Sequence, residues 1–283
     1  MKNRIIITSI FIFICSQTFS QIIVNNLADA KKVSKETGKL IIIDFVANWC
    51  QPCKMMDREY WSNPTSKTTL NNFILVKVDI DLEKGIAGKF GVTSIPNVKI
   101  IDANEYLFHE FLGYDNAERT AKEFEGFPPN VSNYYTALNK IEENKDNYIS
   151  YIKAAIALQN DSETCTAQGK ESLLDKSNEF IESGKKIGKK FSSLDESKLL
   201  LIELIRQHNN VLAGNSRKAI KSIDESKLDD SNKPLGYFVL FRAYLDRNEN
   251  EKVKEYFSKL QSTNSEAYIE RANSIIKKLN ISI

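Results

Sequence analysis

Hydrophobic and polar positions divide this chain into two parts that meet at about residue 128. The first part alternates short apolar runs with amphipathic segments. The run Leu40–Val46 (LIIIDFV) is almost entirely apolar and rich in β-branched residues, which indicates a strand covered on both faces. Further strands are expected at Phe73–Ile80, Asn97–Ile101 and Glu105–Phe111, and helices at Asn26–Thr37, from Cys50 onward, at Leu82–Phe90 and at Asn116–Phe124. This order predicts an α/β domain, residues 21–128, with a mixed sheet and helices on both faces.

The second part, residues 129–283, is expected to be an all-α domain that begins at the Pro128-Pro129-Asn130 break. Helices are expected at Asn133–Asn144, Tyr148–Leu158, Cys165–Phe191, Ser197–Ala213, Ser216–Ile223, Pro234–Arg247, Glu251–Gln261 and Ser265–Leu279. A weak repeat aligns Leu201 and Ile205 with Leu235 and Val239 at an offset of 34 residues, the tetratricopeptide period. A tetratricopeptide-like array and an irregular helical bundle both remain open.

The first twenty residues have the pattern of a signal peptide. Lys2 and Arg4 precede an apolar run, Ile5–Ile14, that is too short to span a bilayer by itself. Thr18-Phe19-Ser20 then supplies small residues where a signal peptidase cuts, so Gln21 is the expected new terminus. The chain is therefore expected to be exported, to the bacterial periplasm or the cell exterior, with no membrane span after cleavage. An uncleaved anchor is the alternative.

Composition and charge narrow the choice of function. Hydrophobic residues make up 42% and charged residues 27% of the chain, which is ordinary for a soluble globular protein. Lys2 and Arg4 leave with the signal peptide, and the remaining 37 basic and 37 acidic residues balance. Such a chain has no basic excess with which to bind nucleic acid. Three of the four cysteines remain, and this odd number argues against a structural disulfide framework.

The chemistry-bearing motif is Trp49-Cys50-Gln51-Pro52-Cys53, which follows the buried strand and opens a helix. Zinc sites also use a C-x-x-C pair, but they need two further ligands. His109 and His208 are isolated in the sequence and Cys165 has no neighbouring partner, so neither a metal nor another cofactor is expected.

The position of the motif favours redox chemistry. Unpaired backbone N–H groups and the positive end of the helix dipole stabilise a thiolate at a helix N-terminus. The pKa of Cys50 is therefore expected to lie below the value of about 8.5 for a free thiol. Cys53 lies almost one helical turn further on, within reach for a disulfide, and Pro52 suits the first turn, which needs no N–H there. The expected site is an exposed nucleophile, Cys50, backed by a resolving thiol, Cys53.

Several separate features make residues 22–127 resemble a thioredoxin-fold domain. Besides the motif they are Asp44 in the strand before it, Lys77 in the next strand, Ile95-Pro96, and Gly113 after the last strand. The resemblance implies that Asp44 is a buried acid that handles the proton of Cys53. It also implies that Lys77 accompanies this acid, and that Ile95-Pro96 is a cis-proline loop beside the disulfide. Substrate binding is assigned by the same resemblance to Trp49, Pro52, Ile95 and Pro96.

Asp44–Ile80 resembles more closely the thioredoxin-like domain of DsbD-type disulfide reductants and their soluble relatives. The segments Tyr60-Trp61-Ser62-Asn63-Pro64 and Lys77-Val78-Asp79-Ile80-Asp81 carry that pattern. Gln51 departs from the glycine of ordinary thioredoxins, and no multi-span membrane segment supplies electrons, so the direction of electron flow stays open.

The leading hypothesis is an exported thiol–disulfide oxidoreductase whose partners are protein thiols and disulfides. The DsbD-like pattern favours reduction of substrates; oxidation or isomerisation is the close alternative, and the upstream thiol donor is not identified. A hypothesis of another class is a binding protein, in which the helical domain recognises a protein partner and the thioredoxin fold is an inherited scaffold.

The signal-peptide pattern gives a first prediction. Expressed in a Gram-negative host, the mature protein should begin at or near Gln21, which N-terminal sequencing of the secreted protein would show. Soluble extracellular protein that still begins with Met1 would contradict it.

Overall fold

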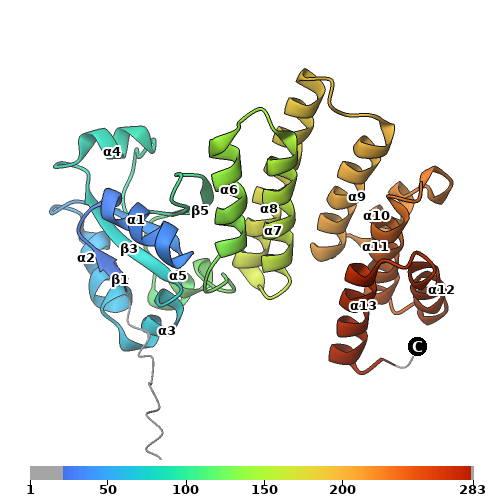
Figure 1. Cartoon of the computed structure of the whole chain (residues 1–283). Coiled ribbons are helices and arrows are strands. Elements are labelled where there is room, and N and C mark those ends of the chain that lie inside the picture. Colours follow the sequence, from blue (N-terminus) through green and yellow to red (C-terminus); the bar gives the residue numbers. More distant parts are fainter. Residues whose placement is uncertain (1–21, 282–283) are drawn as a thin grey trace, which may run out of the picture.

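The structure is a computed structural model that describes residues 22–281. Its first part is a sheet unit with helices on both faces (Figure 1). The signal peptide prediction lies outside the described residues. In chain order the elements of the sheet unit are β1 (Ile22–Val24), α1 (Leu27–Thr37), β2 (Leu40–Val46), α2 (Gln51–Met56), the π-helix η1 (Asp57–Trp61), the 3₁₀ turn η2 (Pro64–Ser66), α3 (Lys67–Leu70), β3 (Phe73–Asp79), α4 (Lys84–Lys89), β4 (Asn97–Ile101), β5 (Leu107–Leu112) and α5 (Ala117–Glu123).

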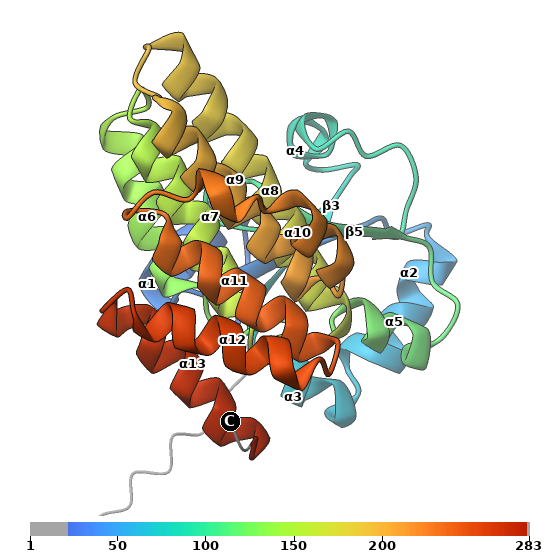
Figure 2. The ribbon, with the colours of Figure 1, turned by 90° about the vertical axis from the view of Figure 1, so that its right-hand side faces the viewer.

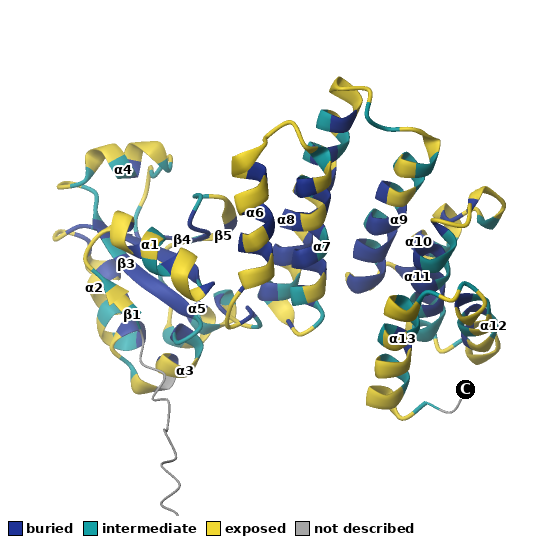
Figure 3. Cartoon of the chain, viewed as in Figure 1, coloured by how far each residue is buried: buried dark blue, intermediate teal, exposed yellow. Residues whose placement is uncertain are grey.

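Strand β2 lies at the centre of the five-stranded sheet, whose order is β1-β3-β2-β4-β5. It pairs in parallel with β3 and antiparallel with β4. Its side chains alternate between two apolar layers. Ile41, Ile43 and Phe45 pack with α1 and α4, whereas Leu40 and Ile42 pack on the other face with α2 and η1. Figure 3 shows β3 buried between helices whose outer faces are exposed. The predicted α/β class with a mixed sheet is confirmed.

The second part contains only helices among the described residues, as predicted. They are α6 (Ser132–Glu143), α7 (Tyr148–Ser162), α8 (Ala167–Lys190), α9 (Glu196–Leu212), α10 (Ser216–Ser222), the 3₁₀ turn η3 (Glu225–Lys227), α11 (Lys233–Asp246), α12 (Asn250–Gln261) and α13 (Glu266–Leu279). Figure 1 shows α6–α8 packed beside the sheet unit and α9–α13 extending away from it, and Figure 2, seen from that side, shows α11–α13 in front of α6–α8. No helix within residues 22–281 is long and apolar enough to cross a membrane.

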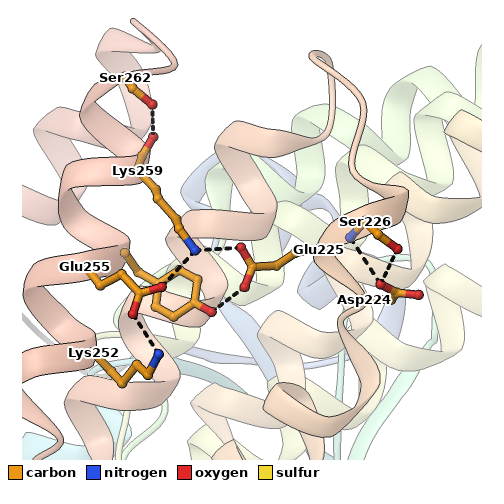
Figure 4. Close-up of polar contacts among 8 residues, drawn as sticks. Asp224, Glu225, Ser226, Lys252, Glu255, Lys259 and Ser262 are labelled. Atoms are coloured by element: carbon orange, nitrogen blue, oxygen red, sulfur yellow. Dashed lines mark hydrogen bonds and ion pairs between the residues drawn. The ribbon is translucent and has the colours of Figure 1, made fainter.

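Two helix pairs keep the 34-residue spacing seen in the sequence. α9 ends at Leu212 and α11 at Asp246, while α10 begins at Ser216 and α12 at Asn250. The turn η3 is joined to α12 through Lys259, whose Nζ lies 2.8 Å from Glu225 Oε2 and 2.8 Å from Glu255 Oε1 (Figure 4). The tetratricopeptide-like character of this region stays a prediction.

The helical region shares a core with the sheet unit. Phe108 of β5 meets Tyr134 of α6 edge-on at a ring distance of 5.8 Å, and Tyr134 meets Phe180 of α8 at 5.6 Å. These rings belong to the same apolar cluster as Leu40 and Ile42 of β2. The Pro128-Pro129 break therefore separates two kinds of secondary structure but not two independent cores.

A buried polar cluster fixes the junction. Asp102, in the turn between β4 and β5, accepts hydrogen bonds from the backbone N–H groups of Asn104 and Tyr106 and from the Tyr134 hydroxyl, at 2.7–2.9 Å. The next tyrosine, Tyr135, accepts from Ala103 N at 2.9 Å and shares a 2.6 Å hydrogen bond with Ser34. The carboxyl of Asp102 is fully buried, and burial raises its pKa to about 6 from 3.8.

This junction lies at the end of the sheet opposite to the C-x-x-C motif. Ile101, directly before Asp102, pairs with Ile41 near the start of β2, whereas Cys50 follows the other end of that strand. The helical region therefore does not pack at the end of β2 that leads to the motif.

The N-terminal turn of α8 also packs backbone against backbone on the loop that follows α5. Gly169 N donates to Glu125 O at 2.9 Å, and a Cβ on Gly169 would lie 2.3 Å from the backbone of Gly126. Gly126 itself has a φ of +76° beside Thr166. Only glycine at both positions permits this backbone contact.

Gly169→Ala should therefore destabilise the whole protein. The added methyl group cannot be accommodated without moving α8, which should cost about 3 kcal/mol of unfolding free energy, measured by urea unfolding. Gly85→Ala in α4 is the matched control, because nothing lies within 4 Å of its new Cβ, and it should gain up to about 1 kcal/mol. Equal stability of the two variants would contradict the close backbone contact.

Asp102 gives the protein a specific pH dependence. A carboxyl whose pKa is higher in the folded than in the unfolded state stabilises the fold when protonated, and this contribution is lost as pH rises through about 6. Asp102→Asn should keep hydrogen-bonding capacity and remove the charge. The unfolding free energy of the variant minus that of the wild type should rise by about 2.5 kcal/mol between about pH 4 and pH 7.5. A flat or falling difference would show that the junction prefers the carboxylate.

Candidate active site

The two motif cysteines lie where β2 gives way to α2. Cys50 is the N-cap of α2 and keeps an extended backbone, and its Sγ accepts the N–H of Cys53 at 3.2 Å. Pro52 stands in the first turn, where no N–H is required. The two sulfurs are joined in a disulfide, with Cα atoms 5.3 Å apart. The predicted thiol pair therefore closes at the helix N-terminus, where backbone N–H groups favour a Cys50 thiolate after reduction.

The expectation that Cys50 is exposed is wrong for this disulfide form. Cys50 is 3% and Cys53 4% exposed. The reason is local packing: Cys50 Sγ turns toward Cys53 and its N–H, and Ile80 and Ile95 pack against the pair. Exposure therefore does not distinguish the two thiols; the N-cap position of Cys50 does.

The residues expected to bind substrate surround this pair unequally. Trp49 is 63% exposed, and its indole N–H donates to Asp81 Oδ2 at 2.8 Å, which fixes the ring. Pro52 is exposed, Ile95 is half-buried and Pro96 is buried. The open surface around the disulfide is therefore formed by Trp49, Pro52 and part of Ile95, whereas Pro96 is buried.

The Ile95–Pro96 peptide bond is cis, as the resemblance implied. The carbonyl of Pro96 accepts the N–H of Gly113 at 2.8 Å. Gly113 has a φ of +79°, which favours glycine and links the loop to the end of β5. The loop places Ile95 against the cysteines.

Asp44 is buried in the centre of the sheet, with 1% exposure. It lies opposite Lys77 of β3 on one side and Val98 of β4 on the other. Burial raises the pKa of Asp44 to about 6 from 3.8, against the opposing effects of the Lys77 ammonium and the Trp61 indole N–H. Lys77 Nζ lies 3.8 Å from Asp44 Oδ2. A carboxyl with this pKa is largely ionised at neutral pH and can act as a proton acceptor.

Two neighbours of this acid were missed by the sequence analysis. Asp57 forms an ion pair with Lys77, so the lysine is shared between two carboxylates. Trp61 is the last residue of η1, and its indole N–H lies near enough to Asp44 to lower the pKa of that carboxyl. Asp57 lies four residues after Cys53, about one turn of the helix, and this spacing is the signal that could have identified it. Burial also lowers the pKa of Lys77.

The remaining candidates have no part in this site. Cys165 is buried, its Sγ donates to Asp161 O at 3.1 Å, and burial raises its pKa to about 11, so it is an unreactive thiol. His109 contacts Glu123 at 2.7 Å, and His208 is buried against Gln159. Within residues 22–281 no group of three or more His, Cys, Asp and Glu side chains is placed to hold a metal ion.

Comparison with known proteins identifies the sheet unit. The family model described as "Thioredoxin" matches residues 21–125. Thioredoxin of Borreliella burgdorferi is 40% identical over 88 residues, which are 30% of this chain and 74% of that protein. Thioredoxin H4 of Arabidopsis thaliana is 36% identical over 89 residues, 31% of this chain and 72% of that protein. Among solved structures, the reduced C-terminal domain of DsbD from Neisseria meningitidis is 20% identical, with 34% of this chain and 89% of that one covered and a TM-score of 0.30.

The family match ends before α6, so it includes the motif, Asp44, Lys77 and the cis-proline loop but none of the helical region. The family and the Cys50–Cys53 pair together make this protein a thiol–disulfide oxidoreductase. On the identities and coverage given above, the chain belongs to the thioredoxin family.

Proposed function

We propose that this protein is an exported reductant of protein disulfides. The observation that carries the proposal is the buried Asp44, with its pKa raised to about 6, on the sheet face covered by the helix that contains Cys53. A reductant must release its mixed disulfide quickly, and this requires a base for the second thiol. The signal-peptide pattern supports export, and the DsbD-like sequence pattern supports reduction.

The reaction begins from the dithiol form. The Cys50 thiolate attacks one sulfur of a substrate disulfide, that S–S bond breaks, and the leaving substrate sulfur departs as a thiolate. The Cys53 thiol then gives its proton to Asp44, and its thiolate attacks Cys50 Sγ. This step releases the second substrate thiolate, which takes up a proton. The substrate gains two electrons and the protein becomes the Cys50–Cys53 disulfide, which an external dithiol must reduce.

The surroundings of the disulfide suit a polypeptide substrate. Trp49 and Pro52 offer exposed, rigid, largely apolar surface beside the sulfurs. Because the helical region packs at the opposite end of the sheet, it leaves this surface free. The helical region is therefore proposed to bind a protein partner at a surface of its own, without forming the wall of the substrate site.

A second candidate function, oxidation or isomerisation of disulfides, is separated from the first by the reduction potential. A reductant should lie nearer to thioredoxin, at about −270 mV, than to the oxidant DsbA, at about −120 mV. Equilibration of the Cys50–Cys53 pair with glutathione buffers measures this value. A potential above about −180 mV, that of protein disulfide isomerase, would reject the reductant and favour an oxidase or isomerase. Failure to reduce insulin with dithiothreitol as donor would leave only the binding-protein hypothesis.

The N-cap position of Cys50 predicts different roles for the two thiols in the exchange reaction. Cys53→Ser should accumulate a mixed disulfide with insulin, because Cys50 attacks and nothing resolves the product; Cys50→Ser should trap at least tenfold less, as judged by intact mass. Cys165→Ser, which changes a buried thiol, is the control and should turn over normally. Equal trapping by the two motif variants would contradict the assignment.

A further inference from the structure

Three buried polar atoms of β2 and η1 have no hydrogen-bond partner among the described residues. They are Oδ1 of Asp44, Nε1 of Trp61 and the hydroxyl oxygen of Tyr60. More than about nine in ten buried polar groups are paired in folded proteins, so such a group needs an explanation. Trp61 and Tyr60 pack edge-on at a ring distance of 5.1 Å, both 6% exposed or less. The cluster belongs to the face of the sheet that Asp44 shares with η1.

The two oxygens of Asp44 have different surroundings. Oδ2 faces Lys77 Nζ at 3.8 Å, beyond ordinary hydrogen-bond distance, because Lys77 also pairs with Asp57. Oδ1 is left for another donor. The indole N–H of Trp61 lies near enough to lower the pKa of the carboxyl, although no hydrogen bond joins it to Oδ1 in this geometry, and an indole N–H can only donate.

The π-helix η1 brings these groups to the acid. Ser62 N donates to Asp57 O at 3.0 Å, five residues back, which defines the wide turn. Its first residue, Asp57, meets Lys77, and its last, Trp61, lies beside Asp44. Single π-turns inside helices are rare and are frequent at functional sites.

We propose that Trp61 is a positioning residue for this oxidoreductase: its indole N–H donates to Oδ1 of ionised Asp44 and, together with Lys77, holds the carboxylate that accepts the Cys53 proton. The role of Asp44 as acceptor of the Cys53 proton rests on the proposed function, whereas the hydrogen bond from Trp61 does not. The described charged groups that face Asp44 are Lys77 from β3 and, behind it, Asp57 from η1. On the other sides Val98 of β4 is apolar and Phe124 at the end of α5 packs 5.7 Å from the Trp61 ring.

This arrangement gives each partner a distinct effect. Lys77 supplies charge from a partly solvated position, whereas Trp61 supplies a hydrogen bond that is neutral and fully enclosed. A donor of this kind stabilises the ionised acid without adding a buried charge. Its loss should raise the proton affinity of Asp44 about tenfold, which is a rise of about one pKa unit.

The test is the titration of Asp44 by carboxyl-carbon NMR in the full-length disulfide form, which needs neither substrate nor activity. Trp61→Phe keeps an aromatic ring and removes the donor, and it should raise the pKa of Asp44 by about one unit. Tyr60→Phe is the matched control: it removes a neighbouring buried hydroxyl from the same turn and should leave that pKa unchanged. Urea unfolding confirms that both variants are folded.

Kinetics then separate this inference from the proposed function. Trp61→Phe should shift the pH profile of mixed-disulfide resolution by the same amount as the Asp44 pKa, and the shift should vanish in the Asp44→Asn background. An unchanged pKa in Trp61→Phe, or an equal rise in Tyr60→Phe, would overturn the inference. A shifted pKa with an unshifted kinetic profile would uphold the Trp61–Asp44 hydrogen bond and reject Asp44 as the base.

Discussion

The burial of strand β2 over Leu40–Phe45 is the constraint on which the rest of this structure depends. Apolar side chains cover the strand on both faces, those of α1 and α4 on one side and those of α2 and η1 on the other. The C-terminal end of the strand leads to Cys50, and the helical region packs near its N-terminal end. A carboxylate within such a strand is kept from water, so Asp44 acquires its raised pKa from the same packing that stabilises the sheet.

The helical region is joined to the sheet through the apolar cluster that covers one face of β2. The apolar face that covers Leu40 and Ile42 continues through Phe108, Tyr134 and Phe180 into α6 and α8. Asp102, Tyr134 and Tyr135 close this contact with buried hydrogen bonds. The helices thus pack at one end of the sheet and leave the disulfide at the opposite end, so the surface around the disulfide is separate from the surface of the helical region.

Sequence patterns predicted most of the fold because each element has a strong local signal. The apolar run LIIIDFV marked β2, and Asn26 and Gly38 marked the ends of α1 that the structure shows as caps. The strand β1 and the turn α3 were missed: β1 has three residues and depends on pairing with β3, and α3 has four, too few for a periodic signal. At the site, the C-x-x-C motif and the cis-proline were accessible from sequence. Trp61 was not, because the π-helix that orients it toward Asp44 is set by tertiary packing, and Asp57 was missed although its spacing from Cys53 pointed to it. The burial of Cys50 likewise depends on Ile80 and Ile95, which lie far from it in sequence.

The most direct test of this account is the rate at which the Cys50 mixed disulfide is resolved, followed by stopped-flow across about pH 5 to pH 8 in the wild type and in Asp44→Asn. If Asp44 accepts the Cys53 proton, the wild-type rate should rise through a midpoint near pH 6, the pKa that burial gives this carboxyl. The variant should be at least tenfold slower at neutral pH and should lack that midpoint, while the first attack by Cys50 stays nearly unchanged. Identical profiles would show that Asp44 is a structural carboxylate and that another group takes the proton.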